Sequence, residues 1–224
     1  MKSPQTYAAI MAGGIGSRFW PASRTSVPKQ FLDILGTGRT LIQSTYDRFL
    51  KPCPKENIFI LTHTDYIDLV KEQLPDITDE QILAEPARKN TAPCIAYAAF
   101  KINKIAPGSN IIVAPSDHII LQEDEFVRVA GLALDFVGKN EALATLGIRP
   151  TRPDTGYGYI QYHEEEVSEG IHRVKTFTEK PAREVAQQFL DSGDFLWNAG
   201  IFIWNTKSIL HALEKNLLEV YDAF

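Results

Sequence analysis

The chain has 224 residues, a formal net charge of -5 and two cysteines, Cys53 and Cys94. Its content of 44% hydrophobic and 23% charged residues is that of an ordinary globular protein. The acidic balance argues against a nucleic-acid binder, because such proteins need a positive surface to hold phosphates. Two cysteines without a CxxC or Cys/His cluster argue against a disulfide scaffold and a zinc site and fit a reducing compartment, so we expect a cytoplasmic protein. The first apolar run is too short for a signal peptide or a membrane span.

In chain order, short apolar runs predict strands and amphipathic runs predict helices between them. The predicted strands are 6–11, 57–62, 110–114 and 142–146, and the predicted helices are 41–50, 66–74 and 92–105. This alternation is typical of a Rossmann-like α/β fold, a mostly parallel sheet with helices on both faces. The chain is less regular from about Thr151, with a strand-rich run at 195–204. We expect one domain, 1–224, with a larger lobe over 1–150 and a smaller lobe over 151–224.

A glycine-rich segment follows the first predicted strand. It reads Ala12-Gly13-Gly14-Ile15-Gly16-Ser17-Arg18. Glycines let backbone N–H groups converge on an anion, and Arg18 and Lys29 can neutralise phosphate oxygens. A tight turn without a ligand is the alternative. Neither common phosphate loop fits: Phe19 occupies the last glycine position of GxGxxG, and the Gly-Lys of a P-loop is absent.

The continuation of this segment resembles the signature of the sugar-nucleotide pyrophosphorylases. In that family a glycine loop and an arginine are followed by a proline and a lysine, here Phe19-Trp20-Pro21 and Pro28-Lys29-Gln30-Phe31. These forms are most similar to the branch that acts as mannose-1-phosphate guanylyltransferases. The resemblance implies a nucleotide-diphospho-sugar transferase fold, with a nucleotide-binding lobe over 1–150 and a sugar-phosphate-binding lobe over 151–224. It also implies GTP and mannose 1-phosphate as substrates, GDP-mannose as product and Mg²⁺ as cofactor.

Two further motifs belong to the nucleotide side. Glu85-Pro86 precedes Asn90-Thr91, where a carboxylate can accept the N–H donors of guanine; the alternative is a helix N-cap ahead of Pro93. In the resembled family this segment is similar to the base-recognition loop. Ser116-Asp117 ends the third predicted strand, where an acidic side chain can hold Mg²⁺ or simply cap a turn. The resemblance assigns Asp117 as a metal ligand, and we interpret His118 as supporting structure.

Three later segments match the sugar-phosphate side of the family in order and spacing. Gly156-Tyr157-Gly158 suits close approach of the backbone to a sugar, or a hairpin turn. Glu179-Lys180 can accept sugar hydroxyls and hold a phosphate, or form a solvated charge pair. Asn198 offers an amide to sugar hydroxyls, and Trp197 before it fits the core.

The resemblance therefore implies a complete set of roles. The residues implied in catalysis are Arg18, Lys29, Asp117 and Lys180, with Asp117 on the metal. The residues implied in nucleotide binding are Ala12, Gly13, Gly14, Gly16, Ser17, Arg18, Glu85, Pro86, Asn90, Thr91 and Ser116. The residues implied in sugar-phosphate binding are Gly156, Tyr157, Gly158, Glu179, Lys180 and Asn198.

Other interpretations stay open at this point. The enzyme could be a thymidylyl- or uridylyltransferase acting on glucose 1-phosphate, or the chain could bind a sugar nucleotide without making it. A nicotinamide-binding oxidoreductase is disfavoured by the glycine spacing. After Gly200, Glu214, Glu219 and Asp222 lie on a predicted terminal helix, and none lies in a motif matching the family's second metal-binding aspartate. We therefore expect the family's C-terminal part to be missing, and we expect no nucleic-acid or membrane partner and a possible homo-oligomer.

Overall fold

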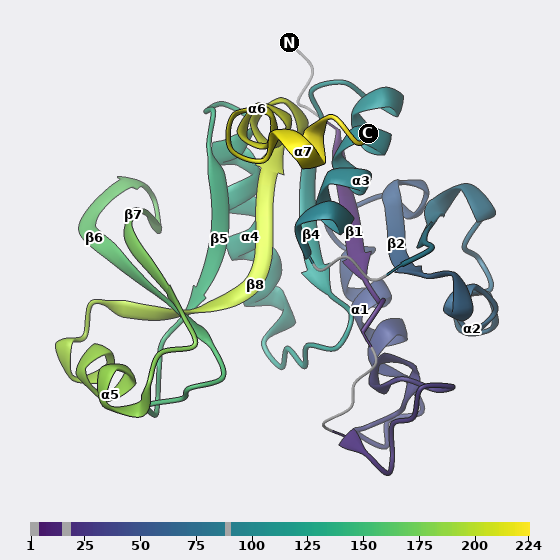
Figure 1. The fold of residues 1–224 in the computed structure, drawn as a ribbon, viewed down its shortest axis with the longest axis horizontal. Coiled ribbons are helices and arrows are strands. Elements are labelled where there is room, and N and C mark those ends of the chain that lie inside the picture. Colours follow the sequence, from purple (N-terminus) through teal and green to yellow (C-terminus); the bar gives the residue numbers. More distant parts are fainter. Residues whose placement is uncertain (1–4, 15–18, 88–90) are drawn as a thin grey trace. The chain divides into compact units, whose positions relative to one another are not determined.

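The structure is a computed structural model that describes residues 5–14, 19–87 and 91–224 (Figure 1). It contains two compact units. The parallel-sheet unit comprises Met1–Leu143 and Ile203–Phe224, and the hairpin unit comprises Ala144–Phe202. The sequence predicts a border at residue 150, whereas the chain enters the hairpin unit at Ala144 and returns to the parallel-sheet unit at Ile203.

Four parallel strands form the centre of the parallel-sheet unit. They are β1 (Thr6–Met11), β2 (Ile58–His63), β3 (Ile82–Glu85) and β4 (Asn110–Pro115), in the order β3-β2-β1-β4. β1, β2 and β4 are buried along almost their whole length, as expected for strands covered on both faces. The prediction of a Rossmann-like α/β fold is confirmed.

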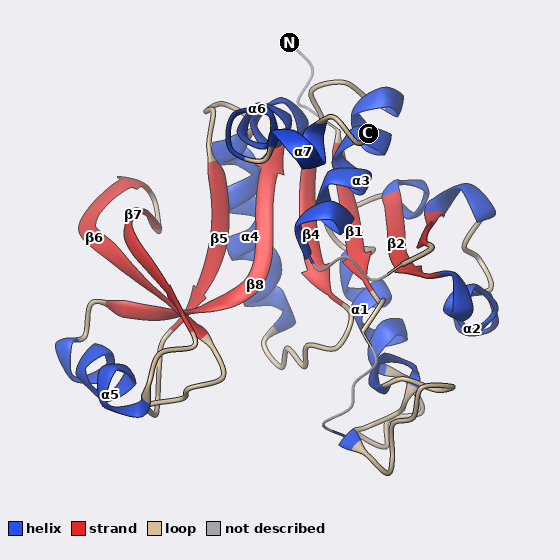
Figure 2. Cartoon of the chain, viewed as in Figure 1, coloured by secondary structure: helices blue, strands red, loops and turns tan. Residues whose placement is uncertain are grey.

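Helices connect these strands and cover the sheet. They are α1 (Leu41–Phe49), α2 (Ile67–Gln73), α3 (Thr91–Ile105) and α4 (Glu123–Val137), followed at the chain's end by α6 (Thr206–Asn216) and α7 (Leu218–Tyr221). The chain steps from β1 to β2 and β3 in one direction, and α3 then crosses back to β4 on the other side of β1. Right-handed crossovers therefore place α1 and α3 on opposite faces, and Figure 2 shows α3 in front of the strands and α1 behind them. The reversal makes β1 and β4 the switch point, where open α/β sheets bind ligands beyond the strands' carboxyl ends.

The hairpin unit is mainly antiparallel. It contains most of β5 (Leu143–Ile148), β6 (Gly158–Ser168), β7 (Ile171–Glu179), α5 (Arg183–Ser192) and most of β8 (Phe195–Asn205). β6 pairs antiparallel with both β7 and β8, and β5 pairs with β8. Its small core consists of Tyr159, Ala186, Phe195 and Trp197, with Phe189 stacked on Phe195 at 3.9 Å between ring centroids.

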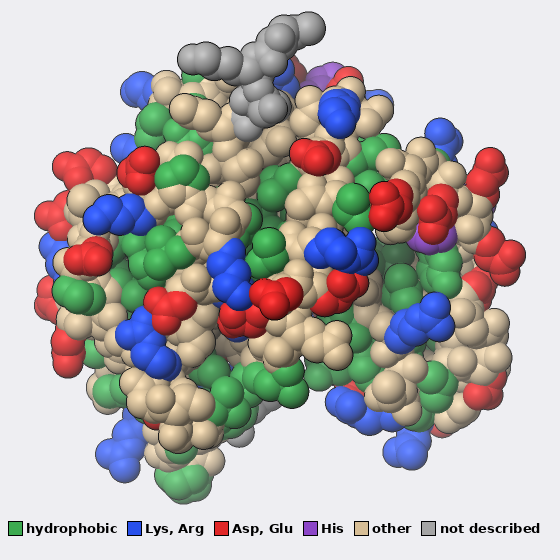
Figure 3. Space-filling view, turned by 180° about the vertical axis from the view of Figure 1, so that it is seen from behind, with side chains coloured by type: hydrophobic (Ala, Val, Ile, Leu, Met, Phe, Trp, Pro, Cys, Tyr) green, Lys and Arg blue, Asp and Glu red, His purple; other side chains and the backbone are tan. Residues whose placement is uncertain are grey.

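The surface carries charges of both signs. On the face drawn in Figure 3, acidic and basic side chains are interspersed with one another. Among the described residues, no helix combines the length and the apolar character needed to cross a membrane.

Candidate functional site

The glycine loop and the predicted metal ligand lie at the switch point. Ala12, Gly13 and Gly14 follow β1 directly, and Asp117 follows β4, the neighbouring strand. The N–H of Ser116 donates to the carbonyl of Met11 at 2.9 Å and so joins the ends of the two strands. A Cβ added to Gly14 would meet no atom of the described residues within 4 Å, so packing against those residues does not demand glycine there. The predicted residues Gly16, Ser17 and Arg18 lie outside the described residues.

Two of the predicted catalytic residues form an ion pair. Lys29 Nζ lies 3.2 Å from Asp117 Oδ2, although the two residues are 88 positions apart. The side chains keep 22% and 39% of their surface exposed, so solvent or a ligand can reach both. Lys29 Nζ also lies 4.6 Å from the centroid of the Phe19 ring. The switch point thus presents a cation and a carboxylate next to the glycine loop.

Gln30 is a member of the site to which the sequence argument gave no role. Its Nε2 donates to the carbonyl oxygens of Ala12 at 2.8 Å and Gly14 at 3.0 Å, and the residue is 4% exposed. Thr62 Oγ1 donates to the same Ala12 oxygen at 3.1 Å. The only signal in the sequence is that Gln30 follows Lys29 within the quoted Pro-Lys-Gln-Phe motif.

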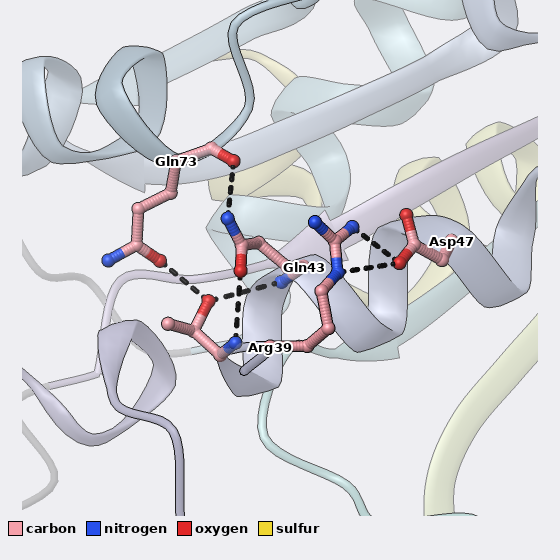
Figure 4. Close-up of polar contacts among 5 residues, drawn as sticks. Arg39, Gln43, Asp47 and Gln73 are labelled. Atoms are coloured by element: carbon pink, nitrogen blue, oxygen red, sulfur yellow. Dashed lines mark hydrogen bonds and ion pairs between the residues drawn. The ribbon is translucent and has the colours of Figure 1, made fainter. Parts of the chain in front are cut away.

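The short turn that carries Lys29 and Gln30 is fixed to two helices. Gln73, at the end of α2, donates from Nε2 to the carbonyl of Phe31 at 3.0 Å. The same side chain accepts from Thr40 Oγ1 at 2.6 Å, and Gln43 Nε2 donates to the Gln73 carbonyl at 2.9 Å (Figure 4). Thr40 and Gln43 form the capping box that begins α1. The start of α1, the end of α2 and the Lys29–Phe31 turn are therefore one hydrogen-bonded assembly.

The predicted base-recognition residues follow β3. Glu85 lies beside His63 in the register of β2 and β3, and a hydrogen bond from Cys94 reaches its carboxylate. Burial raises the pKa of Glu85, against the lowering effects of Cys94 and His63. Pro86 and Thr91 are exposed, Thr91 begins α3, and Asn90 lies outside the described residues. This end of β3 offers a half-buried carboxylate with exposed neighbours, as a base-binding loop needs.

The residues on either side of Asp117 are more enclosed. Ser116 is buried, and its carbonyl accepts from Thr45 Oγ1 at 3.2 Å. Burial lowers the pKa of His118, with Asp117 acting in the opposite direction and the cations Lys29 and Arg48 adding to the lowering. His118 is thus partly buried within the electrostatic influence of Asp117, Lys29 and Arg48, and its supporting role stays a prediction.

In the hairpin unit, Asp154 organises the turn that contains Gly156. Its Oδ1 accepts from the N–H of Gly156 at 2.8 Å and its Oδ2 from Arg152 at 2.7 Å. The backbone hydrogen bond from Gly156 has the larger effect, and together with Arg152 it lowers the pKa of the Asp154 carboxyl. Gly158 lies opposite Glu179 in the register of β6 and β7, and a Cβ there would lie 2.7 Å from Glu179 Oε2. Tyr157, between the two glycines, packs edge-on against Trp197 at 5.1 Å between ring centroids.

Glu179 and Lys180 form a solvated pair at the end of β7. Lys180 Nζ lies 2.9 Å from Glu179 Oε1, and both side chains are 56% exposed. Lys180 has a φ of 46°, a left-handed conformation that non-glycine residues rarely adopt. Its N–H donates to the carbonyl of Tyr157 at 3.2 Å. Strained backbone of this kind concentrates at functional sites, which supports a role for Lys180.

Asn198 is oriented by its neighbours. Its Oδ1 accepts from Thr145 Oγ1 at 2.8 Å and from the N–H of Gly200 at 3.2 Å. Gly200 has a φ of 67°, which glycine adopts readily. The amide oxygen is thus engaged within the hairpin unit, and the amide nitrogen is the end that can donate to a ligand.

Comparison with known proteins shows the family to which the chain belongs. Residues 7–224 match the protein family described as nucleotidyl transferase. The chain belongs to the nucleotidyl transferase family. It is 37% identical to a mannose-1-phosphate guanylyltransferase of Escherichia coli K12 across 100% of the chain and 48% of the relative. It is also 37% identical to the alginate biosynthesis protein AlgA of Pseudomonas aeruginosa, across 95% of the chain and 44% of that protein.

A solved structure shows the same fold. The crystal structure of mannose-1-phosphate geranyltransferase from Thermus thermophilus superposes with a TM-score of 0.88 and 30% identity, covering 98% of this chain and 63% of that one. This nucleotidyl transferase chain spans about half the length of the curated relatives it matches.

The donor set of this nucleotidyl transferase at the switch point contains one carboxylate. Within 5–14, 19–87 and 91–224, no group of three or more His, Cys, Asp or Glu side chains is gathered as in a metal cage. Asp117 is accessible and lies at a strand's carboxyl end beside the glycine loop. A single protein carboxylate completed by phosphate oxygens and water is a common way to hold Mg²⁺. The residues present therefore fit a magnesium ion that enters with a nucleotide, and do not fit a site built wholly from protein ligands.

Proposed function

We propose that this chain transfers a guanylyl group from GTP to mannose 1-phosphate, giving GDP-mannose and pyrophosphate. The observation that carries the proposal is the Lys29–Asp117 pair at the switch point, beside the glycine loop. This is the place in an open α/β sheet where nucleotides bind. The mannose-1-phosphate guanylyltransferase name of the E. coli relative supports the choice of substrates.

In this proposal the parallel-sheet unit holds GTP. Backbone N–H groups of the loop after Ala12 receive the phosphates, since the Ala12 N–H itself donates to the carbonyl of Leu61 at 2.7 Å, and Lys29 neutralises part of their charge. Arg18 takes the same role on the strength of the motif alone. Glu85 accepts the N–H donors of guanine, which thymine and uracil do not present in the same pattern. Its raised pKa reflects burial that a bound base can offset by hydrogen bonding.

The hairpin unit in turn holds mannose 1-phosphate. Glu179 accepts sugar hydroxyls, and the Lys180 ammonium binds the phosphate as a point charge. The Asn198 amide nitrogen donates to a sugar hydroxyl, consistent with the engagement of its oxygen by Thr145 and Gly200. Gly156, Tyr157 and Gly158 supply backbone that can approach the sugar closely.

The reaction is an in-line substitution at the α-phosphorus of GTP. A phosphate oxygen of mannose 1-phosphate forms a bond to that phosphorus, and the bond to the oxygen that bridges the β-phosphorus breaks, so pyrophosphate leaves. Both reactants are anions, so catalysis consists mainly of positioning and of offsetting charge. Lys29 and the loop N–H groups offset charge on the triphosphate, and Lys180 orients the attacking phosphate.

We propose Mg²⁺ as the cofactor, with Asp117 as its protein ligand. When bound, the ion neutralises phosphate oxygens and adds to the positive charge at the α-phosphorus. Asp117 has the accessible carboxylate that such an ion requires.

The test is pyrophosphate release by the 224-residue chain with Mg²⁺, comparing GTP, UTP and dTTP, each with mannose 1-phosphate and with glucose 1-phosphate. We expect GTP with mannose 1-phosphate to be the preferred pair and Asp117→Ala to reduce release by roughly 100-fold or more, because even the outer-shell partners of a metal ligand are worth about 10- to 100-fold. Asp135→Ala, which removes an exposed carboxylate from α4, should have no effect. Equal use of the three nucleotides would refute the base assignment. Binding of GDP-mannose without pyrophosphate release would indicate a chain that holds the sugar nucleotide without making it.

A further inference from the structure

We propose that Gln30 is a positioning residue that fixes the first part of the glycine loop, Ala12 to Gly14, in the form that receives a nucleotide's phosphates. This proposal rests on the proposed function, because it assigns the loop to a triphosphate. The buried amide nitrogen of Gln30 donates to two carbonyl oxygens of that loop, Ala12 at 2.8 Å and Gly14 at 3.0 Å. Both amide hydrogens are thereby directed at the loop.

The loop needs such a device because glycine leaves its peptide groups free to rotate. A carbonyl oxygen turned toward a phosphate would repel it, whereas an N–H turned toward it is attractive. In a trans peptide the C=O and N–H groups point in opposite directions. By holding the Ala12 carbonyl, Gln30 therefore directs the N–H of Gly13 to the side away from itself. Fixing dipoles before the ligand arrives removes the cost of reorganising them during the reaction.

Gln30 is itself held firmly enough to act in this way. It lies in the Lys29–Phe31 turn, whose last carbonyl accepts from Gln73 at 3.0 Å. The Phe31 ring is buried and packs edge-on against Tyr66 at 6.0 Å between ring centroids. The same turn directs Lys29 to Asp117. One anchored turn therefore supplies the charge at the switch point and the fixed amide beneath the loop.

The chemistry of the side chain explains why glutamine is needed at this position. An ionised glutamate of the same shape has only acceptors and would repel both carbonyl oxygens. Methionine has similar length and no donor, so it would fill the space and release the loop. Thr62 holds only the Ala12 oxygen, which Gln30 also holds, so its loss should matter less.

The experiment measures binding of Mg·GTP and of mannose 1-phosphate by calorimetry to the full 224-residue chain and its variants. For Gln30→Met we expect the Kd for Mg·GTP to rise about tenfold or more, because two hydrogen bonds are lost, with the Kd for mannose 1-phosphate unchanged. Thr62→Val should raise the Kd for Mg·GTP less than about threefold, since the Ala12 oxygen keeps its bond from Gln30. Gln188→Met, an exposed glutamine on α5, should change neither.

Gln30→Glu supplies a readout that a merely structural role would not move. Protonation gives the new carboxyl one O–H donor for the loop carbonyls. The affinity of the Gln30→Glu variant for Mg·GTP, divided by that of the unaltered chain at the same pH, should therefore rise as the pH falls from about 8 to about 5.5. Unchanged GTP affinity in Gln30→Met, or an equal loss for both ligands, would overturn the proposal. If Gln30→Met does not fold, a pH-independent affinity ratio for Gln30→Glu overturns it instead. If the unaltered chain binds UTP or dTTP in place of GTP, only the assignment of guanine as the base fails, and the Gln30 variants are then compared with that nucleotide. If the unaltered chain binds none of the three nucleotides, both the proposed function and the role of Gln30 are overturned.

Discussion

At the scale of single residues, the hydrogen bonds that a side chain already makes determine what it can offer to a ligand. Asn198 is the clearest case, because its Oδ1 accepts from Thr145 and from the backbone of Gly200. Thr145 Oγ1 lies 3.0 Å from the carbonyl of Ile201 as well. The Thr145 hydroxyl, whose one hydrogen is shared between these two acceptors, and the Gly200 N–H therefore together orient the amide that the proposed function assigns to the sugar.

We predict that Thr145→Val weakens sugar-phosphate binding while leaving the nucleotide untouched. Valine keeps the shape and the strand preference of threonine but has no hydroxyl, so Asn198 loses a partner. The KM for mannose 1-phosphate should rise about three- to tenfold, in line with the loss of one neutral hydrogen bond. Steady-state kinetics with each substrate varied in turn provides the measurement, and Thr145→Ser, which keeps the hydroxyl, is the control. An equal rise in the KM for GTP would argue against this role.

A second residue-scale prediction concerns Gly158. Its substitution by alanine places a Cβ 2.7 Å from Glu179 Oε2 and 3.0 Å from Phe177 Cζ, so these side chains must move. Glu179 is exposed and flexible, so the cost in stability should be small, below about 1 kcal/mol. The affinity for mannose 1-phosphate should nevertheless fall severalfold in a calorimetric titration. Gly131→Ala is the matched control: its Cβ meets no described atom within 4 Å, so affinity should stay constant.

At the scale of elements, the assembly of α1, α2 and the Lys29–Phe31 turn connects helix capping to the site. Thr40 accepts from the N–H of Gln43 at 3.4 Å and donates to Gln73 Oε1 at 2.6 Å. Gln73 in turn holds the carbonyl of Phe31. The cap of α1 therefore supports, through Gln73, the turn that carries Lys29 and Gln30.

We predict that Thr40→Ala lowers the free energy of unfolding by about 1–2 kcal/mol. The variant loses the α1 cap, typically worth about 1 kcal/mol, and the bond to Gln73. Urea denaturation followed by circular dichroism measures the change, and Thr40→Ser, which keeps the hydroxyl, should retain most of the stability. A loss below about 0.3 kcal/mol would show that solvent replaces both hydrogen bonds.

The sequence predicted the parallel part of the fold well because its strands are continuous apolar runs. β1 lies at 6–11 as predicted, and β2, β4 and α3 agree within one residue at each end. The β6–β7 hairpin was not predicted, because its strands are largely exposed and carry a run of charges, Glu164-Glu165-Glu166. Helix α4 was also missed, although three acidic residues mark its first turn.

From residue types and motifs, the sequence predicted which residues belong to the candidate site better than it predicted which of them contact one another. Asp117 was expected at the end of a strand, and the structure places it directly after β4. Glu85 was expected only in a loop that opens a helix, and the structure places it at the end of β3, a strand that was not predicted. The Lys29–Asp117 pair joins residues 88 positions apart, and the bonds of Gln30 join segments 16 to 18 positions apart. The first pairing depends on the strand order and the second on how the Lys29–Phe31 turn folds back on the loop after β1, and periodicity alone specifies neither.

At the scale of the whole molecule, the proposed chemistry is divided between the two units. The groups proposed for the nucleotide lie in the parallel-sheet unit, and those proposed for the sugar phosphate lie in the hairpin unit. Both cysteines also belong to the parallel-sheet unit and are buried there, Cys53 ahead of β2 and Cys94 in α3. Their reactivity therefore reports on the opening of that unit.

We predict that neither thiol reacts with a chromogenic disulfide reagent at about pH 8 while the chain is folded. Burial raises the pKa of Cys53 to about 12, and burial together with Glu85 raises the pKa of Cys94 further. Since the thiolate is the reactive form, a raised pKa leaves only about one Cys53 in ten thousand ionised at that pH, and access is blocked as well. In denaturant both thiols should react, giving two equivalents per chain. Rapid reaction of one equivalent without denaturant would show instead that the parallel-sheet unit opens readily around that cysteine.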